Sequence, residues 1–178
     1  MVRVEGSDLL VKRLGAEERH VFATAQEAEG RAAFIAEALS WVGTPFRDCA
    51  DVKGPNGAVD CAMLLVRSAV DTGRVPPFDP RPYSPRWMLH KSEEKFLGWM
   101  LRLGAREVGA PRVGDIVIWR FGRTFAHGAV LINSEQVVHA YAHARCVLVS
   151  DLGEPLLRYL PASFGPIPRP VRYFDLWS

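Results

Sequence analysis

The 178-residue chain has few cysteines and no long hydrophobic segment. Three cysteines are an odd number, which argues against the disulfide framework of a small secreted domain. Hydrophobic residues make up 48% of the chain, enough for the core of one domain without such bridges. No apolar run approaches the roughly 20 residues of a transmembrane helix. The polar first eight residues lack the apolar region of a secretory signal peptide, so we expect synthesis in the cytoplasm without one.

An excess of charge is also missing. The 22 Lys and Arg against 20 Asp and Glu leave a net charge of +2, with the two signs interspersed. Nucleic acid is therefore not an expected partner, because its binding relies on clustered basic residues. Neither Cys-x-x-Cys nor His-Glu-x-x-His spacing occurs, so we expect no metal and no other cofactor. A zinc cluster drawn from the remaining candidates is the weaker alternative: Cys49, Cys61, His127, His139 and His143.

Helical patterns occupy the first half of the chain. A capping box at Thr24 to Glu27, followed by Ala28, Ala32, Ile35, Leu39 and Val42 at helical spacing, predicts a helix over residues 25–42. Residues 1–23 are then a separate N-terminal arm, and residues 24–178 form a single domain. Asp60 is a candidate N-cap for a second helix that ends at Gly73, a candidate left-handed residue.

The chain between this helix and the strands is rich in proline. Residues 75–85 hold five prolines, which predict an ordered surface loop. A third helix begins at Pro85, with Ser84 as N-cap, or at Ser92, and ends at Leu103 before Gly104. Its predicted buried side consists of Phe96, Leu97, Met100 and Leu101.

Strand-like patterns fill the second half. Short runs rich in β-branched and aromatic residues predict strands at residues 116–119, 128–132, 136–141, 146–149 and 171–174. Helices first and strands second indicate an α+β domain, in which N-terminal helices pack on a C-terminal antiparallel β-meander.

Cys61 is the candidate nucleophile. It follows the N-cap Asp60, and the N–H groups and dipole of a helix start stabilise a thiolate. A cysteine is more often a small buried hydrophobic residue, but this one follows a flexible loop, Gly54 to Gly57, and precedes suitable histidines. We therefore expect a thiolate paired with protonated His127, and helix-start N–H groups that stabilise the oxyanion.

The strand count brings two histidines together. If residues 133–135 form a three-residue turn, Ile132 pairs with Gln136 and His127 faces Tyr141. His139 is then diagonal to His127 on the same face, roughly 7–8 Å away between Cα atoms. A turn of two or four residues would place the imidazoles on opposite faces. With the odd turn, His139 orients His127 as the third member of a Cys–His–His set.

Several short motifs in this order resemble the NlpC family of cell-wall peptidases. They are Gly43-Thr44-Pro45-Phe46, Gly57-Ala58-Val59-Asp60-Cys61, Pro111-Arg112-Val113-Gly114-Asp115, Ala126-His127-Gly128-Ala129-Val130 and His139-Ala140. The resemblance covers residues 32–141. Residues 65–67 and 82–87 further resemble the subgroup encoded beside tail genes of phages and gene transfer agents.

The resemblance implies a papain-like core in which Cys61 is the nucleophile, His127 the base and His139 the orienting residue. The expected substrate is a peptidoglycan stem peptide, cut between γ-D-glutamate and a diamino acid. Asp60, Phe46, Ala62 and Tyr141 are the expected substrate-binding residues. Phage-like tail proteins are candidate partners, and a tail particle would carry the protein to the periplasm and cell wall.

Three features depart from the family pattern. Phe46 stands where the family usually has Tyr, Ala62-Met63 replaces a small residue followed by Gly, and Asp48-Cys49 replaces other polar residues. Two alternatives stay open. One is a tail-tip or hub protein of the same fold with little activity, and the other is an amidase or acyltransferase on the same scaffold.

Overall fold

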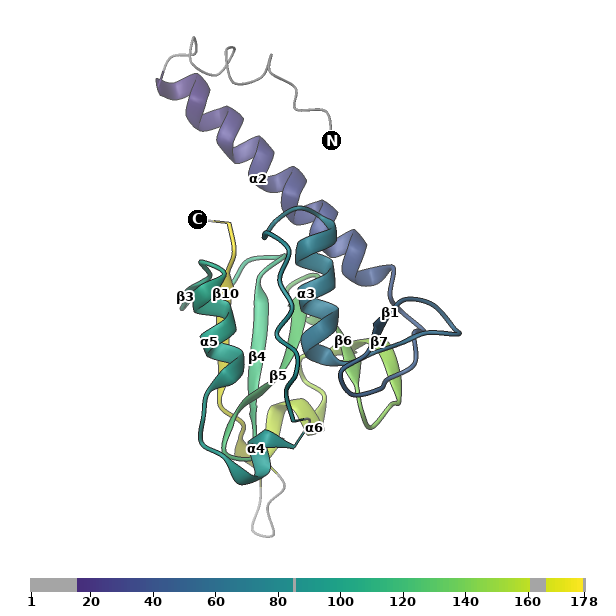
Figure 1. The fold of residues 1–178 in the computed structure, drawn as a ribbon. Coiled ribbons are helices and arrows are strands. Elements are labelled where there is room, and N and C mark those ends of the chain that lie inside the picture. Colours follow the sequence, from purple (N-terminus) through teal and green to yellow (C-terminus); the bar gives the residue numbers. More distant parts are fainter. Residues whose placement is uncertain (1–15, 85, 161–165, 178) are drawn as a thin grey trace.

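The computed structural model describes residues 16–84, 86–160 and 166–177, and residues 1–15 of the predicted N-terminal arm lie outside them. A six-stranded antiparallel sheet in the order β3-β10-β4-β5-β6-β7 forms its centre. The helices α2, α3 and α5 lie on one face of this sheet (Figure 1). The predicted α+β architecture is confirmed, with β10 inserted between β3 and the meander β4 to β7. Within the described ranges, no helix is long and apolar enough to cross a membrane.

The three longest helices precede the strands of the sheet as predicted, but a hairpin precedes α3 and α6 follows β7. The helices are α2 (Ala16–Leu39), α3 (Cys61–Asp71), α4 (Trp87–His90), α5 (Lys95–Arg102) and α6 (Pro155–Arg158). The sheet consists of β3 (Arg106–Val108), β4 (Ile116–Phe121), β5 (Thr124–Leu131), β6 (Gln136–Tyr141), β7 (Cys146–Asp151) and β10 (Val171–Asp175). Two short hairpins pair β1 (Asp51–Val52) with β2 (Ala58–Val59), and β8 (Tyr159–Leu160) with β9 (Ile167–Pro168).

The sheet is covered on both faces. A large core joins α2, α3 and α5 to one face, and a smaller core that includes Trp119, Leu131 and Leu157 covers the other, which we call the outer face. Alternate residues of a strand point to opposite faces. His127 and His139 therefore share the outer face with Ala129 and Val137.

The first helix differs from its prediction in start and orientation. It already includes Ala16 and ends at Leu39, so both ends of the predicted range 25–42 are wrong. Its buried residues are Arg31, Phe34 and Ala38, and Trp41 is buried in the turn that follows. The predicted inward residues Ala28, Ala32 and Val42 are exposed. Alanines recur on every side of this helix, so their spacing did not reveal which side carries the large residues that pack.

The second helix is confirmed at both ends. Asp60 is its N-cap and accepts a hydrogen bond from the Met63 N–H at 2.8 Å. Gly73 follows the helix with a φ of 68°, the left-handed conformation that glycine adopts readily. Because the helix begins at Cys61, this thiol lies in its first turn.

The predicted third helix is divided into α4 and α5. The N-cap of α4 is Arg86, so the predicted cap at Ser84 is wrong, and Pro85 lies outside the described residues. Phe96, Leu97 and Met100 are buried as predicted, whereas Leu101 is 64% exposed and Trp99 is buried instead. Phe96, Trp99 and Met100 follow the i, i+3, i+4 pattern of one helix side, and Leu101 falls outside it.

Arg31 is a buried clamp between α2 and the ends of two strands. Its side chain donates to Asp115 Oδ1 at 2.7 Å and to the Val113 carbonyl at 2.9 Å, just before β4. It also donates to Asp175 Oδ1 at 2.9 Å, at the end of β10. Asp115 and Asp175 are 1% and 2% exposed, so the guanidinium neutralises carboxylates that water does not reach.

We expect Arg31→Met to lower the free energy of unfolding by about 3–5 kcal/mol, because it removes the side-chain cation beside the buried Asp115. Arg67→Met is the matched control, since Arg67 pairs with Asp71 at the surface. It should cost less than about 1 kcal/mol. Urea denaturation of both variants measures the difference. Equal losses would show that the clamp contributes no more than a surface ion pair.

Candidate active site

The hairpin β1–β2 delivers the chain to the start of α3. Gly57 lies in its turn, where an added Cβ would meet the Val52 carbonyl oxygen at 2.0 Å, so only glycine allows this close approach. Val59 is completely buried and anchors the hairpin in the core. Asp60 and Cys61 follow directly, which places the thiol beside Ala126 of β5.

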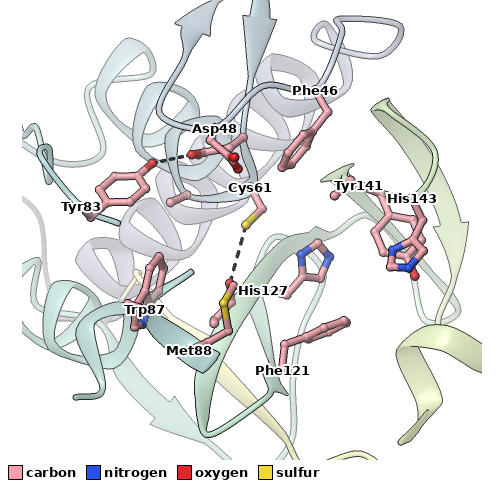
Figure 2. Close-up of a pocket in the computed structure, with 14 residues that line it drawn as sticks. Phe46, Asp48, Cys61, Tyr83, Trp87, Met88, Phe121, His127, Tyr141 and His143 are labelled. Atoms are coloured by element: carbon pink, nitrogen blue, oxygen red, sulfur yellow. Dashed lines mark hydrogen bonds between the residues drawn. The ribbon is translucent and has the colours of Figure 1, made fainter. Parts of the chain in front are cut away.

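A β-bulge lies immediately before His127. Trp119 pairs with His127 but Arg120 pairs with Phe125, which leaves Ala126 without a partner on β4. Bulges bend a strand and redirect side chains, and they are common beside active sites. The Cys61 thiol lies 3.8 Å from the Ala126 carbonyl oxygen, so the bulge also places a weak acceptor against the sulfur (Figure 2). His127 thus lies within β5, and not at the head of a strand as predicted.

The predicted contact between the two histidines is confirmed. Val130 pairs with Val138, and Ile132 donates to the Gln136 carbonyl at 2.9 Å, which is the register of a three-residue turn. The Nε2 atom of His127 lies 2.8 Å from Nδ1 of His139. The hairpin therefore brings the imidazoles together on the outer face, as the strand count required.

Ser150 extends this pair on the next strand. Its Oγ lies 2.9 Å from Nε2 of His139, whose side chain is completely buried. Sequence reasoning missed this residue. The β6–β7 pairing, in which His139 lies opposite Leu148, would have identified it, since Ser150 is then the diagonal neighbour of His139.

Cys61 and His127 line one cavity of about 180 Å³ (Figure 2). Of the other predicted site residues, Phe46, Asp60, Ala62 and Tyr141 also line it, whereas His139 lies behind His127. Further lining residues were not among the predicted ones: Asp48, Tyr83, Trp87, Met88, Phe121, Ala126, Ala142 and His143. Met63, which could have crowded the groove, is 1% exposed and packs into the core.

Asp60 is buried beside Cys61 and holds three donors. One oxygen accepts from the Met63 N–H, and the other accepts from the Cys49 N–H and the Tyr83 hydroxyl, both at 2.7 Å. Burial raises the pKa of the Asp60 carboxyl, while these hydrogen bonds oppose the shift. Phe46 lines the pocket without the hydroxyl of the tyrosine that the resemblance led us to expect. Tyr83, from the proline-rich segment, provides a hydroxyl in the same pocket.

Burial of Cys61 and His127 favours the neutral form of both side chains. Burial, and then the Asp60 charge, raise the pKa of the Cys61 thiol to about 12. Burial lowers the pKa of His127 well below its usual value, and His139, Arg169 and His143 lower it further. These shifts oppose the predicted thiolate–imidazolium pair in the free protein, and the pair stays a prediction. The helix-start N–H groups do lower the thiol pKa, but their effect is smaller than that of burial.

This protonation state predicts the pH dependence of alkylation. Below the pKa of the Cys61 thiol, its thiolate fraction grows about tenfold per pH unit, so its reaction with iodoacetamide should accelerate continuously from pH 6 into the alkaline range. Peptide-resolved mass spectrometry of protein alkylated across this range measures the rate at each cysteine. A plateau of fast Cys61 alkylation below pH 7 would instead reveal a preformed ion pair.

Two solved structures resemble this fold. The structure of the peptidoglycan hydrolase RipB from Mycobacterium tuberculosis is 17% identical, with a TM-score of 0.51 over 93% of this chain and 70% of that one. The structure of NlpC1 from Trichomonas vaginalis is 16% identical, with a TM-score of 0.52 over 82% of this chain and 43% of that one. No protein-family model and no curated protein matches the sequence. The structural similarity supports the predicted papain-like NlpC fold.

Proposed function

We propose that this chain is a cysteine peptidase of the NlpC family that hydrolyses an amide bond in peptidoglycan stem peptides. One observation carries the proposal: a helix-start thiol and an imidazole line the same cavity, and a second imidazole holds the first at 2.8 Å. Nucleophilic catalysis requires a thiol, a base and a group that orients the base. Cys61, His127 and His139 take these roles.

The contacts among His127, His139 and Ser150 are compatible with proton transfer from the Cys61 thiol to His127. If Nε2 of His127 carries the hydrogen, it donates to Nδ1 of His139, whose own Nε2–H donates to Ser150 Oγ. The Nδ1 atom of His127 is then unprotonated and able to accept a proton from the thiol. The contacts from His127 to Ser150 accommodate this tautomer, which is the one that a general base needs.

The reaction begins from the neutral pair. As the Cys61 sulfur attacks the amide carbonyl, His127 takes the thiol proton and the C–S bond forms. The N–H groups at the start of α3, including that of Cys61, stabilise the oxyanion. His127 then gives its proton to the leaving amine, which breaks the C–N bond. A water molecule activated by His127 hydrolyses the thioester and restores the thiol.

The bond that we propose is the link between γ-D-glutamate and a diamino acid. The name of RipB as a peptidoglycan hydrolase supports a cell-wall substrate. The exposed Asp48 and the buried Asp60 form an acidic side of the cavity, while Phe46, Ala62 and Tyr141 form apolar walls. This combination suits a short peptide with an amine. We further propose delivery to the cell wall by a phage-like tail particle, following synthesis in the cytoplasm.

Digestion of purified sacculi tests the function. Mass spectrometry of the soluble fragments should find stem peptides cut between glutamate and the diamino acid, and none with heat-inactivated protein. Fragments cut between the sugar and the peptide would instead identify an amidase. Intact sacculi, together with a correctly folded protein, would favour the tail-tip structural role.

A further inference from the structure

Arg169 is a buried cation behind the pocket, in the link between β9 and β10. Its side chain is 8% exposed and its Nη atoms donate only to carbonyls: Arg120 at 2.7 Å, Tyr159 at 3.0 Å and Leu156 at 3.1 Å. Its Nε is buried and has no partner in the described ranges, where Arg169 also forms no ion pair with a carboxylate. A buried charge is normally paired, so this arrangement requires an explanation.

The guanidinium and His127 contact the same aromatic ring. The Cζ atom of Arg169 lies 3.8 Å from the ring centroid of Phe121, and the Phe121 ring lies 5.2 Å from the His127 imidazole. Phe121 lines the pocket below His127 (Figure 2). The bond to the Arg120 carbonyl fixes the end of β4, so Arg169 holds the ring that supports the base.

The charge acts on His127 as well. Besides Arg169, the ionisable groups nearest this imidazole are Cys61, His139, Tyr141 and His143, from α3, β6 and the loop after it. The carboxylates of Asp48 and Asp60 line the same pocket. Burial keeps Cys61 and His139 neutral near pH 7. The Tyr141 hydroxyl also stays neutral there, and His143 is exposed. Arg169 is thus the permanent cation in this described set, and a fixed cation opposes a second positive charge nearby.

We propose that Arg169 is a positioning residue that fixes Phe121 beneath His127 and keeps the imidazole neutral. Its carbonyl partners come from β4, α6 and β8, so the cation needs no carboxylate that would cancel its field at the base. Burial already lowers the pKa of His127, and this cation adds to that effect, so the base stays unprotonated at mildly acidic pH. The effect on activity rests on the proposed peptidase function, whereas the effect on His127 titration does not.

NMR titration of the full-length protein labelled at its histidines tests this directly, without substrate. Arg169→Gln keeps a hydrogen-bond donor and removes the charge, so the titration midpoint of His127 should move to higher pH. We compare both proteins at an acidic pH where wild-type activity is already falling. There, the neutral fraction of His127 should be several-fold lower in Arg169→Gln than in the wild type, and kcat/KM on stem peptide should be lower in parallel. Arg169→Lys keeps the charge, so its midpoint should stay at the wild-type value even if the protein is less stable.

Arg172→Gln is the matched control. Arg172, on β10, lies over the ring of Phe125, and its side chain is more exposed than that of Arg169. It should leave the His127 midpoint unchanged. An unchanged midpoint in folded Arg169→Gln protein would overturn the proposal, as would an upward shift in Arg169→Lys. If Arg169→Gln does not fold, Arg169→Met replaces it, because it also removes the charge and should shift the His127 midpoint to higher pH in the same way. If the His127 midpoints follow the prediction but neither the wild type nor any variant hydrolyses peptide, the proposed peptidase function fails. The proposed effect of Arg169 on His127 titration still stands.

Discussion

Replacing Cys61 by alanine should abolish hydrolysis of cell-wall peptide and leave the fold intact. Without the sulfur no acyl-enzyme forms, and loss of a nucleophile lowers kcat by at least about a thousandfold. The residue is half-buried at the first turn of α3, and its side chain is small. Its truncation should therefore cost much less stability than a large-to-small core change. Activity on sacculi and thermal unfolding measure the two effects separately.

The other two cysteines provide the controls. Cys49 contacts the Tyr83 carbonyl through its sulfur and does not line the pocket, so Cys49→Ser should retain most of the activity. Cys146→Ser should do the same, because Cys146 lies on β7 outside the cavity. A loss in Cys49→Ser equal to that in Cys61→Ala would place Cys49 in the reaction. Unfolding of Cys61→Ala would favour a purely structural cysteine.

The histidines should show a graded loss of activity. His127→Ala removes the proposed base and should lose essentially all hydrolysis, by a factor close to that of Cys61→Ala. His139→Ala leaves the base in place but removes its partner at 2.8 Å, so a smaller loss is expected. His139→Asn and His139→Gln restore a hydrogen-bonding group and should retain more activity than His139→Ala. Steady-state kcat of folded variants gives the order.

Ser150→Ala tests whether the contact between Ser150 and His139 contributes to activity. Ser150 touches only the far nitrogen of His139, so its removal should cost less than any change at His139. Equal activity in His139→Ala and wild-type protein would contradict the orienting role. Greater loss in His139→Gln than in His139→Ala would contradict it as well, since the hydrogen bond would then be harmful.

The start of α3 and the histidine pair could be predicted because their signals are local. Asp60 caps the helix through its own side chain and places Cys61 in the first turn. The β5–β6 register follows from a three-residue turn, in which the Asn133 side chain accepts from the Gln136 N–H at 2.8 Å. Both features depend on residues close together in the sequence, so spacing reduced the histidine pair to one open question, the length of the turn.

Features that depend on distant residues could not be predicted. The Arg31 clamp joins α2 to residues near β4 and β10, and the Tyr83 hydroxyl reaches Asp60 from another segment. The burial that raises the pKa of the Cys61 thiol was also missed. A helix start suggests a low thiol pKa, but burial against the sheet, which sequence does not reveal, has the larger effect. Arg169 likewise resembles a surface arginine until its burial is known.

Capture of the acyl-enzyme tests the central claim most directly. Protein mixed with stem peptide and quenched in acid should carry one added acyl group of the substrate's glutamyl side, joined to Cys61 as a thioester. Peptide mapping by mass spectrometry locates the adduct, and hydroxylamine should remove it. The account predicts this adduct in wild-type protein and its absence in Cys61→Ala. Hydrolysis by Cys61→Ala at the wild-type rate, or an adduct on another residue, would contradict it.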